Sequence, residues 1–478
     1  MDNFERFIVE NEGADTARLA MSRREWPAPG DPCLAGLDAR GLAINTIESR
    51  RKLRKKVPEW AAEAGLVYPS TLCAEQCSSS DTARYKASIA ARVISEYAGA
   101  GDGTLVTELV EVTESSESGK KGRIADLTGG LGVDSWAFSE IAEEVIYNEM
   151  NPELAAVARH NFKVLGVDNI TVKNFEATPE NIKSILSGSE GTATHTQEHK
   201  DIPGDPRPDI IFLDPARRDS TGKKVFLLED CSPDVLRMLP GLFEESRFIL
   251  LKLSPMADIT MAVERLDRVY ESFLEKTSGD GWNGQWVREI HIVASGGECK
   301  ELLILMDREW KGGYSLICRE DGKTLTFSQE EIATAKAAYP DSTFARIIFE
   351  PGKSLTKAGA FNALCERFGL TKLARFTHLY TISEPLSDSE LQERINILKD
   401  FGKVYLVKEI LPLNKVSMKE VGKRYPHSEV SAKNIPMTSD GLRKRLKVSS
   451  GDDAHIFGVR IETPYNEDNY LIVTKINH

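Results

Sequence analysis

Residues 121–150, KGRIADLTGGLGVDSWAFSEIAEEVIYNEM, constrain the fold of this chain more than any other stretch. An apolar strand over residues 123–127 is predicted to run into a glycine-rich turn, and glycine lets the backbone turn sharply and approach a ligand closely. A helix is expected to begin near residues 133–135, with Asp134 or Ser135 as its cap. The next strand, residues 144–147, leads to Glu149, whose carboxylate can accept hydrogen bonds from ribose hydroxyls. The pattern therefore predicts a site for a nucleoside-containing cofactor.

This stretch resembles motifs I and II of the class I S-adenosylmethionine-dependent methyltransferases. The matching residues are Asp126, Thr128, Gly129, Gly130, Gly132 and Glu149. Thr128 stands where many of these enzymes have their first glycine, and the GxGxxG pattern of dinucleotide-binding turns is absent. The resemblance implies S-adenosylmethionine as cofactor. Asp126 and the glycines would hold its methionine and ribose portion, and Glu149 would take the ribose hydroxyls. The alternative is a glycine turn in an ordinary α/β domain.

A third strand is predicted over residues 170–173, and Asn174, Phe175, Glu176 and Ala177 follow its end. In the family that the chain resembles, an acid or amide at this place contacts the adenine, and an apolar neighbour packs on the base. Glu176 is the candidate, with Phe175 or Ala177 beside it. An exposed loop glutamate is the alternative.

The fourth strand, residues 208–213, is almost entirely apolar, as expected of a central parallel strand. It ends in Asp214, Pro215, Ala216 and Arg217. This segment resembles motif IV of the nucleic-acid methyltransferases, (Asp/Asn)-Pro-Pro-(Tyr/Phe), which accepts hydrogen bonds from the target amine and stacks an aromatic ring on the base. The resemblance implies catalytic roles for Asp214, Pro215 and Arg217. Ala216 and Arg217 replace the second proline and the aromatic residue, so the sequence does not decide whether an exocyclic amine is methylated. The alternative is that Asp214 and Pro215 form a simple turn without a catalytic role.

Cysteine placement argues against a covalent mechanism. Methyltransferases that act on C5 of a pyrimidine use a thiolate at motif IV or at the end of the fifth strand, here residues 247–253, and neither place carries a cysteine. The seven cysteines are scattered and odd in number, which indicates reduced thiols. Cys73 and Cys77 have no partner pair and no nearby histidine, so no metal site is predicted. A sulfonium already makes its methyl group reactive, so the reaction needs no metal.

The 478 residues are expected to form several domains. The predicted fold class is α/β, with a Rossmann-like class I methyltransferase core, an N-terminal helical domain and two C-terminal α+β domains. We place the helical domain at residues 1–100, the core at 101–275, a ferredoxin-like domain at 280–380 and a THUMP-like domain at 381–478. A helix over residues 81–97 either packs on the core or closes over the cofactor. In the second case Gln76, Ser78, Ser79 and Lys86 would lie near the methionine or the substrate, and Lys86 could pair with a carboxylate.

The C-terminal third carries the second part of the resemblance. Strands are expected near residues 287–318 and a helix over residues 357–368. Together with the segments DLTGGLGVDS, DPARRD and GGECKEL, this region resembles a bacterial methyltransferase family in which a ferredoxin-like unit precedes a THUMP-like domain. THUMP domains proper bind structured RNA ends, so the resemblance implies structured RNA as partner.

Charge gives a mixed indication of the substrate. The net charge of −12 argues weakly against a protein that binds nucleic acid over its whole surface. Basic residues cluster at 50–56 and at 415–447, where they form either a phosphate-binding surface or solvated helix faces. We interpret the chain as a methyltransferase that acts on RNA, either rRNA or tRNA, at a base nitrogen. The alternatives are a methyltransferase of small molecules or proteins, and a non-catalytic RNA-binding protein that retains the cofactor fold.

Segments that would target or anchor the chain are not expected. No run of about 20 apolar residues occurs, so a membrane span is not predicted. The first 15 residues are acidic and lack the apolar core of a signal peptide, so a cytoplasmic location is expected. The oligomeric state is left open.

Overall fold

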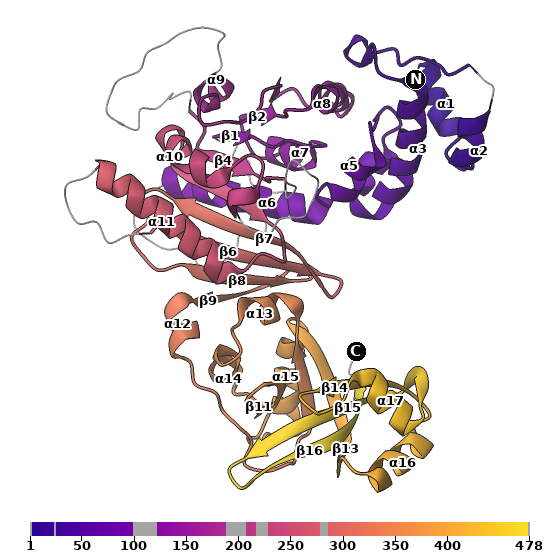
Figure 1. The fold of residues 1–478 in the computed structure, drawn as a ribbon, viewed down its shortest axis with the longest axis vertical. Helices are drawn as coiled ribbons and strands as arrows, with labels where there is room; N and C mark the ends of the chain where they lie inside the picture. The colour runs from indigo at the N-terminus through magenta and orange to yellow at the C-terminus, as the bar shows by residue number, and fades with distance from the viewer. Residues whose placement is uncertain are drawn as a thin grey trace. The chain divides into compact units, whose positions relative to one another are not determined.

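The computed structural model describes residues 2–22, 25–98, 122–187, 207–216, 228–277 and 285–476 (Figure 1). The chain forms two compact units. The first comprises residues 1–287 and 304–311, and the second comprises residues 288–303 and 312–478. Within the described ranges, no helix is both long and apolar enough to cross a membrane.

The first unit begins with helices that share a core with the following α/β part. They are α1 (Asn3–Glu10), α2 (Thr16–Met21), η1 (Pro32–Leu34), α3 (Ala39–Lys56), α4 (Pro58–Ala62), α5 (Thr71–Gln76) and α6 (Ser80–Ala98). Phe4, Ile8 and Ile47 pack in one buried cluster with Val157 of α8 (Pro152–Val164). The side chain of Asn161 on α8 also bonds the backbone N and O of Val67, at 3.0 and 2.9 Å. The predicted helical region therefore packs directly on the core.

Five parallel strands form the centre of the first unit. They are β1 (Arg123–Asp126), β2 (Glu144–Asn148), β3 (Ile170–Lys173), β4 (Ile210–Leu213) and β5 (Phe248–Leu253), and they lie in the order β3-β2-β1-β4-β5. The chain runs outward from β1 to β3 and then returns to β4 on the other side of β1. In doubly wound sheets a ligand binds where the strand order reverses, outside the carboxyl ends of the strands. This point lies between β1 and β4.

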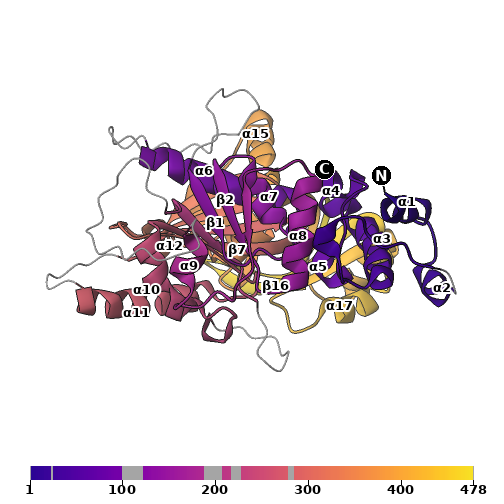
Figure 2. The same cartoon turned by 90° about the horizontal axis from the view of Figure 1, so that it is seen from above.

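Helices cover both faces of these strands. Figure 2 shows α6, α7 (Val133–Ser139) and α8 on one face, and α9 (Ile182–Leu186), α10 (Val235–Glu245) and α11 (Ile259–Thr277) on the other. Because both faces are covered, the strands are apolar throughout, and every residue of β4 is buried. The predicted strands 123–127, 144–147 and 170–173 are confirmed to within a residue or two.

The sheet continues beyond β5 with four further strands. The order proceeds β5-β7-β6-β8-β9, and the helix α12 follows. The strands are β6 (Val287–Ser295), β7 (Glu298–Asp307), β8 (Ser315–Glu320) and β9 (Lys323–Ser328), and α12 is Gln329–Thr334. The short helix η2 (Leu228–Asp230) precedes α10.

A second sheet forms the C-terminal part of the second unit. Its order is β11-β12-β10-β13-β16-β15-β14. The elements are β10 (Ile347–Pro351), α13 (Lys353–Ala358), α14 (Ala363–Phe368), β11 (Thr371–Ala374), β12 (Thr377–Thr381), α15 (Asp388–Lys399), β13 (Gly402–Pro412), α16 (Lys415–Arg424), β14 (His427–Lys433), α17 (Ser439–Leu446), β15 (Ser449–Thr463) and β16 (Asn466–Ile476). Leu373, Leu379, Tyr405 and Phe457 belong to one buried cluster, so the strands from β11 to β15 in this order share a core.

The ferredoxin-like domain that we expected over residues 280–380 contains strands of two sheets. The pairs β6–β8 and β8–β9 belong to one sheet, whereas β10, β11 and β12 pair in the other. The mixed α/β fold class is confirmed, and the four domain boundaries stay predictions.

Candidate active site

The glycine turn after β1 is fixed by contacts with β2 and α8. Gly129 donates its N–H to the carbonyl of Asn148 at 2.8 Å, and a Cβ on Gly129 would lie 2.1 Å from the ring of Tyr147. Gly132 has φ of +94°, and a Cβ there would meet the ring of Phe162 at 2.7 Å. These two positions exclude any side chain, so the turn presents backbone to a ligand at the switch point.

Asp126 lies at the end of β1 and is buried. One carboxylate oxygen accepts a hydrogen bond from Ser135 Oγ at 2.6 Å, and the other accepts one from the backbone N of Thr128 at 3.1 Å. The pKa of Asp126 is raised to about 7, mainly by burial and also by the nearby carboxylates of Asp134 and Asp214, while the two hydrogen bonds act to lower it. The carboxyl group is therefore poised to respond to a nearby positive charge.

The predicted cap of the helix that follows is wrong. Gly132 is the N-cap of α7 and makes no side-chain cap bond. Ser135 instead donates to Asp126, and Asp134 turns to Lys86 on α6, with a distance of 3.0 Å between Nζ and Oδ1. Both side chains therefore bind partners that are distant in the sequence, and a capping rule based on local sequence does not take such partners into account.

Glu149 follows β2 and faces the glycine turn. Its Oε2 accepts a hydrogen bond from the backbone N of Gly130 at 2.9 Å, and its Oε1 accepts one from Asn151 N at 2.8 Å. Each carboxylate oxygen has two lone pairs and accepts one hydrogen bond from the described residues, which leaves one acceptor position on each oxygen for a pair of vicinal hydroxyls. This arrangement fits the ribose of a nucleoside.

The loop after β3 is attached to the loop after β2. Asn148 exchanges two hydrogen bonds with the backbone of Phe175, at 3.0 and 3.1 Å, and the amide of Asn174 donates to the carbonyl of Glu149 at 2.6 Å. The side chain of Glu176 is exposed, and Phe175 is 44% exposed. The structure thus places Glu176 on the same edge of the sheet as Glu149. Sequence reasoning missed Asn148, which joins the two loops.

The turn after β4 meets the turn after β1 directly. The backbone N of Asp214 donates a hydrogen bond to Thr128 Oγ1 at 2.6 Å, and Pro215 is buried. Asp214 Oδ2 accepts a hydrogen bond from Lys252 Nζ at 2.6 Å. Arg217, the third predicted catalytic residue, lies outside the described residues. Motifs I and IV, which are 86 residues apart, are therefore joined through Thr128.

The helix α5 lies beside this site. Burial raises the pKa of the Cys73 thiol, with a smaller contribution from Glu149, and raises that of Cys77 to about 11. Cys77 is the C-cap of α5, and the next residue, Ser78, donates to Asp134 Oδ2 at 2.8 Å, so the end of α5 lies next to Asp134. A thiol with so high a pKa is a poor nucleophile, as expected of a structural cysteine. Across the ranges that the structure covers, no three His, Cys, Asp or Glu side chains are grouped to hold a metal ion.

Lys86 pairs with a carboxylate, as one reading of the sequence suggested. It is fully buried, and Nζ donates to Ser78 Oγ at 2.9 Å, while Ser78 donates to Asp134 Oδ2 at 2.8 Å. This pair fastens α6 and the segment after α5 to the first turn of α7.

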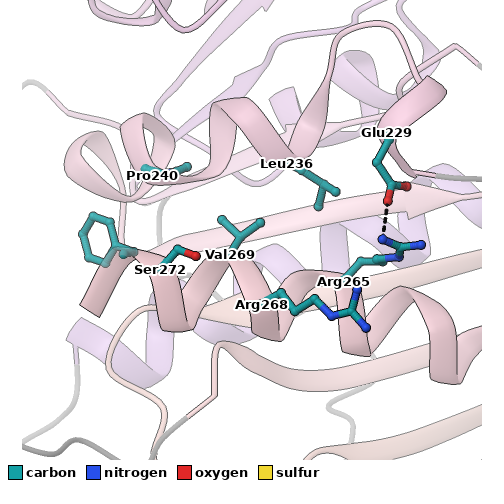
Figure 3. Close-up of a pocket in the computed structure, with 8 residues that line it drawn as sticks. Glu229, Leu236, Pro240, Arg265, Arg268, Val269 and Ser272 are labelled. Carbon is teal, nitrogen blue, oxygen red and sulfur yellow. Dashed lines mark ion pairs between the residues drawn. The ribbon is translucent and has the colours of Figure 1, made fainter. Parts of the chain in front are cut away.

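A groove of about 310 Å³ lies between α10 and α11 (Figure 3). Leu236, Pro240 and Val269 line its apolar part, and Arg265 forms an ion pair with Glu229 at 2.8 Å. None of the residues predicted for the cofactor or the substrate lines this groove.

The two basic clusters differ in their surroundings. In α3, Arg50 is buried, Arg51 donates to the carbonyls of Glu12 and Ala14, and Arg54 pairs with Glu12 at 3.0 Å, so this cluster has a structural role. In α16 and α17, which lie side by side, six cationic side chains are exposed. These are Lys415, Lys419, Lys423, Arg424, Lys444 and Arg445, and Lys447, the C-cap of α17, is exposed as well.

Comparisons with known proteins agree with this fold. A family model described as a ferredoxin-like domain matches residues 348–388, and one described as THUMP domain-like matches residues 402–475. The chain is also similar to a protein from Porphyromonas gingivalis W83, whose crystal structure is described as that of a "putative methyltransferase". The identity is 25%, the match covers 99% of this chain and 98% of that one, and the TM-score is 0.72. The chain therefore carries ferredoxin-like and THUMP-like domains and a methyltransferase-like fold, as the resemblance implied.

Other solved structures match a smaller part of the chain. A methyltransferase from Streptococcus mutans, SMU.1697c, again described as "putative" and crystallised with SAH, is 11% identical over 39% of this chain and 89% of that one, with a TM-score of 0.24. Trm5b from Pyrococcus abyssi is 14% identical over 39% of this chain and 44% of that one, with a TM-score of 0.21. Likenesses of this size carry no conclusion about substrate. No curated protein matches the chain.

Proposed function

We propose that the chain is an S-adenosylmethionine-dependent methyltransferase that acts on RNA, either rRNA or tRNA, at a base nitrogen. One observation supports this most: the hydrogen bond from Asp214 N to Thr128 Oγ1 brings a cofactor-type turn and a motif IV-type turn to one switch point. A methyl donor and an acceptor can then lie within reach of each other, and alignment alone contributes about 7–11 kcal/mol to such a transfer.

The residues after β1, β2 and β3 fit S-adenosylmethionine. The turn of Gly129 and Gly132 has no room for side chains, and Glu149 is held with one acceptor position on each oxygen. When bound, the cofactor supplies a methyl group activated by its sulfonium. Its methionine and ribose portion would lie against Asp126, Thr128, Gly129, Gly130 and Gly132. Glu149 would bind the ribose hydroxyls and Glu176 the adenine.

Asp214, Pro215 and Arg217 would receive the acceptor base. A carboxylate oxygen of Asp214 and a backbone carbonyl can accept the N–H groups of a base, which directs the nitrogen lone pair at the methyl group. Stacking on the guanidinium of Arg217 would replace the aromatic contact of motif IV.

The exposed cations of α16 and α17 support RNA as the partner. Lysine and arginine side chains on one surface neutralise phosphates and release counterions, which provides affinity without reading sequence. The THUMP-like match covers both helices. A cytoplasmic location is consistent with such a substrate.

The proposal is tested with radiolabelled S-adenosylmethionine and RNA from a strain that lacks the gene. We expect the purified protein to label an rRNA or tRNA fraction from this strain but not from the parent strain, where the site is already methylated. The Asp214→Ala variant should label neither. Equal labelling of both RNA preparations, or none, would contradict the proposal.

A second candidate is suggested by the net charge of −12. A methyltransferase of a small molecule or a protein has no need of a phosphate-binding surface, and its activity would be insensitive to salt.

A non-catalytic RNA-binding role is the third candidate, because Ala216 and Arg217 alter motif IV. In that case Asp214→Ala would leave the cellular function unchanged.

A further inference from the structure

Two lysines that belong to neither motif balance the carboxylates of the switch point. Lys86 pairs with Asp134 and is fully buried. Lys252, in β5, pairs with Asp214, and the side chain of Lys252 is 11% exposed while that of Asp214 is 38% exposed. The first pair is therefore enclosed in the protein, whereas the second presents its acid to solvent at the carboxyl end of β4.

Two hydrogen bonds and a buried neighbouring residue hold Asp214 in place. Its backbone N donates to Thr128 Oγ1 at 2.6 Å, its Oδ2 accepts from Lys252 Nζ at 2.6 Å, and the next residue, Pro215, is buried. Among the described residues, no hydrogen bond engages Asp214 Oδ1. Because one oxygen is held by the lysine, the direction of the other oxygen is set.

We propose that Lys252 is a positioning residue for methyl transfer, which orients Asp214 so that Oδ1 accepts a hydrogen bond from the nitrogen that receives the methyl group. This inference rests on the proposed function. In the transfer, the acceptor nitrogen forms a bond to the methyl carbon with its lone pair. The bond from this carbon to sulfur breaks, its electron pair stays on sulfur, and the proton of the nitrogen passes to Asp214 Oδ1.

The sequence explains why this role falls to residue 252. In β5, Leu251 and Leu253 are buried and Lys252 is the one residue that is only partly buried. Successive side chains of a strand point to opposite faces, so Lys252 near the carboxyl end of β5 faces away from its two leucine neighbours. Since β4 and β5 are adjacent and parallel, with Leu213 opposite Leu251, the ends of both strands bring Asp214 and Lys252 together.

The first test compares Lys252→Met with Lys252→Arg in the full-length protein. A small misplacement of a catalytic group costs about a hundredfold in rate, so Lys252→Met should lower kcat by about this factor while KM for RNA and affinity for S-adenosylmethionine stay within about twofold. Lys252→Arg should recover part of kcat, because it keeps the positive charge. Lys183→Met is the matched control, since Lys183 on α9 forms an exposed pair with Glu244 at 3.3 Å.

A double variant shows whether Lys252 acts through Asp214. If it does, Asp214→Asn with Lys252→Met should be no slower than Asp214→Asn alone. Multiplied losses in the double variant, an equal loss of kcat in Lys183→Met, or an unchanged kcat in Lys252→Met would each overturn the inference.

A crystal structure of each variant gives a readout without RNA. The Asp214 carboxylate should keep its orientation in Lys252→Arg and turn toward solvent in Lys252→Met. If it keeps its orientation in Lys252→Met, the inference is wrong whatever the RNA assay shows. If the wild-type protein labels no RNA while the carboxylate turns as expected, the proposed substrate fails and the positioning role stands.

Discussion

Asp126 connects burial with charge at the scale of a single residue. Its carboxyl group is enclosed, it accepts hydrogen bonds from Ser135 and Thr128, and its pKa is raised to about 7. A methyl donor with a sulfonium and an ammonium brings positive charge to this site. Such a charge favours the ionised carboxylate and lowers its pKa, so binding should release protons near neutral pH.

This linkage predicts a pH dependence of cofactor affinity. Below pH 7 Asp126 is mostly protonated and must lose its proton on binding, so affinity should rise about tenfold from pH 6 to pH 8. Calorimetry in buffers of different ionisation enthalpy measures the protons released. In Asp126→Asn the affinity should be flat over this range, and an unchanged slope in this variant would contradict the assignment.

Glu149 gives a second prediction at this scale. Glu149→Gln keeps the size of the side chain but replaces one acceptor oxygen by an NH₂ donor, so cofactor affinity should fall about tenfold or more. The readout is the shift in thermal unfolding that S-adenosylmethionine causes, which shrinks as affinity falls. Glu153→Gln, an exposed substitution on α8, is the control and should keep the full shift. Equal shifts in both variants would remove Glu149 from the site.

At the scale of elements, the contact between α16 and α17 depends on one glycine. A Cβ on Gly422 would lie 1.9 Å from the backbone carbonyl O of Leu446, which ends α17. Gly422→Ala should therefore destabilise the THUMP-like domain by about 3 kcal/mol, measured by chemical denaturation. Gly441→Ala is the control within α17, because its nearest atom is the side-chain Thr438 Oγ1 at 3.3 Å. Similar losses in both variants would mean that the close approach of the helices is not the cause.

His455 in β15 makes the stability of the second sheet depend on pH. It stacks on Phe457 with ring centroids 4.2 Å apart, and burial lowers the pKa of His455 to about 4. The folded state therefore favours the neutral imidazole, so stability is full above the unfolded pKa near 6.5 and is lost as pH falls toward 4. His455→Phe should reduce the loss of stability between pH 6.5 and 4 by about 2 kcal/mol relative to the wild-type protein. The pH dependence of the denaturation midpoint tests this, and an identical dependence in both proteins would contradict it.

The sequence predicted the elements with strong local signals. The strands β1–β3 agree with the prediction because short apolar runs mark them in the sequence. The predicted helix over residues 357–368 is two helices, α13 and α14, because Gly359 adopts φ of +69° and ends the first. The strands β11 and β12 were not predicted, since their side chains face the residues of β15, which are far away in the sequence.

Motif order predicted which residues of the candidate site lie near one another. Asp126, the glycines, Glu149 and Asp214 follow the carboxyl ends of neighbouring strands and contact one another, while their roles stay predictions. Lys252 and Asn148 could not be predicted, because their roles arise from neighbours that only the sheet brings together. The prediction of Asp134 as a helix cap was wrong for the same reason, since its partner Lys86 lies on another helix.

At the scale of the whole molecule, methylation of RNA requires a surface that binds phosphates, and we propose that the second unit provides it. Replacing Lys444 and Arg445 by Glu should weaken RNA binding by about tenfold or more and reduce the slope of log affinity against log salt by about 2. Filter binding over a salt series measures both. Lys323→Glu with Lys336→Glu is a control with the same charge change at exposed lysines outside α16 and α17. An equal effect in the control would show that net charge, and not this surface, sets the affinity.

We propose that S-adenosylmethionine binds at the turn after β1, and calorimetric titration of the purified protein measures this binding. The wild-type protein should bind the cofactor with an affinity on the order of micromolar. Asp126→Ala should lose this binding, and NAD should give no heat of binding to the wild-type protein. Binding of NAD in place of S-adenosylmethionine, or binding of S-adenosylmethionine that Asp126→Ala leaves intact, would show that the turn after β1 is not a site for this cofactor.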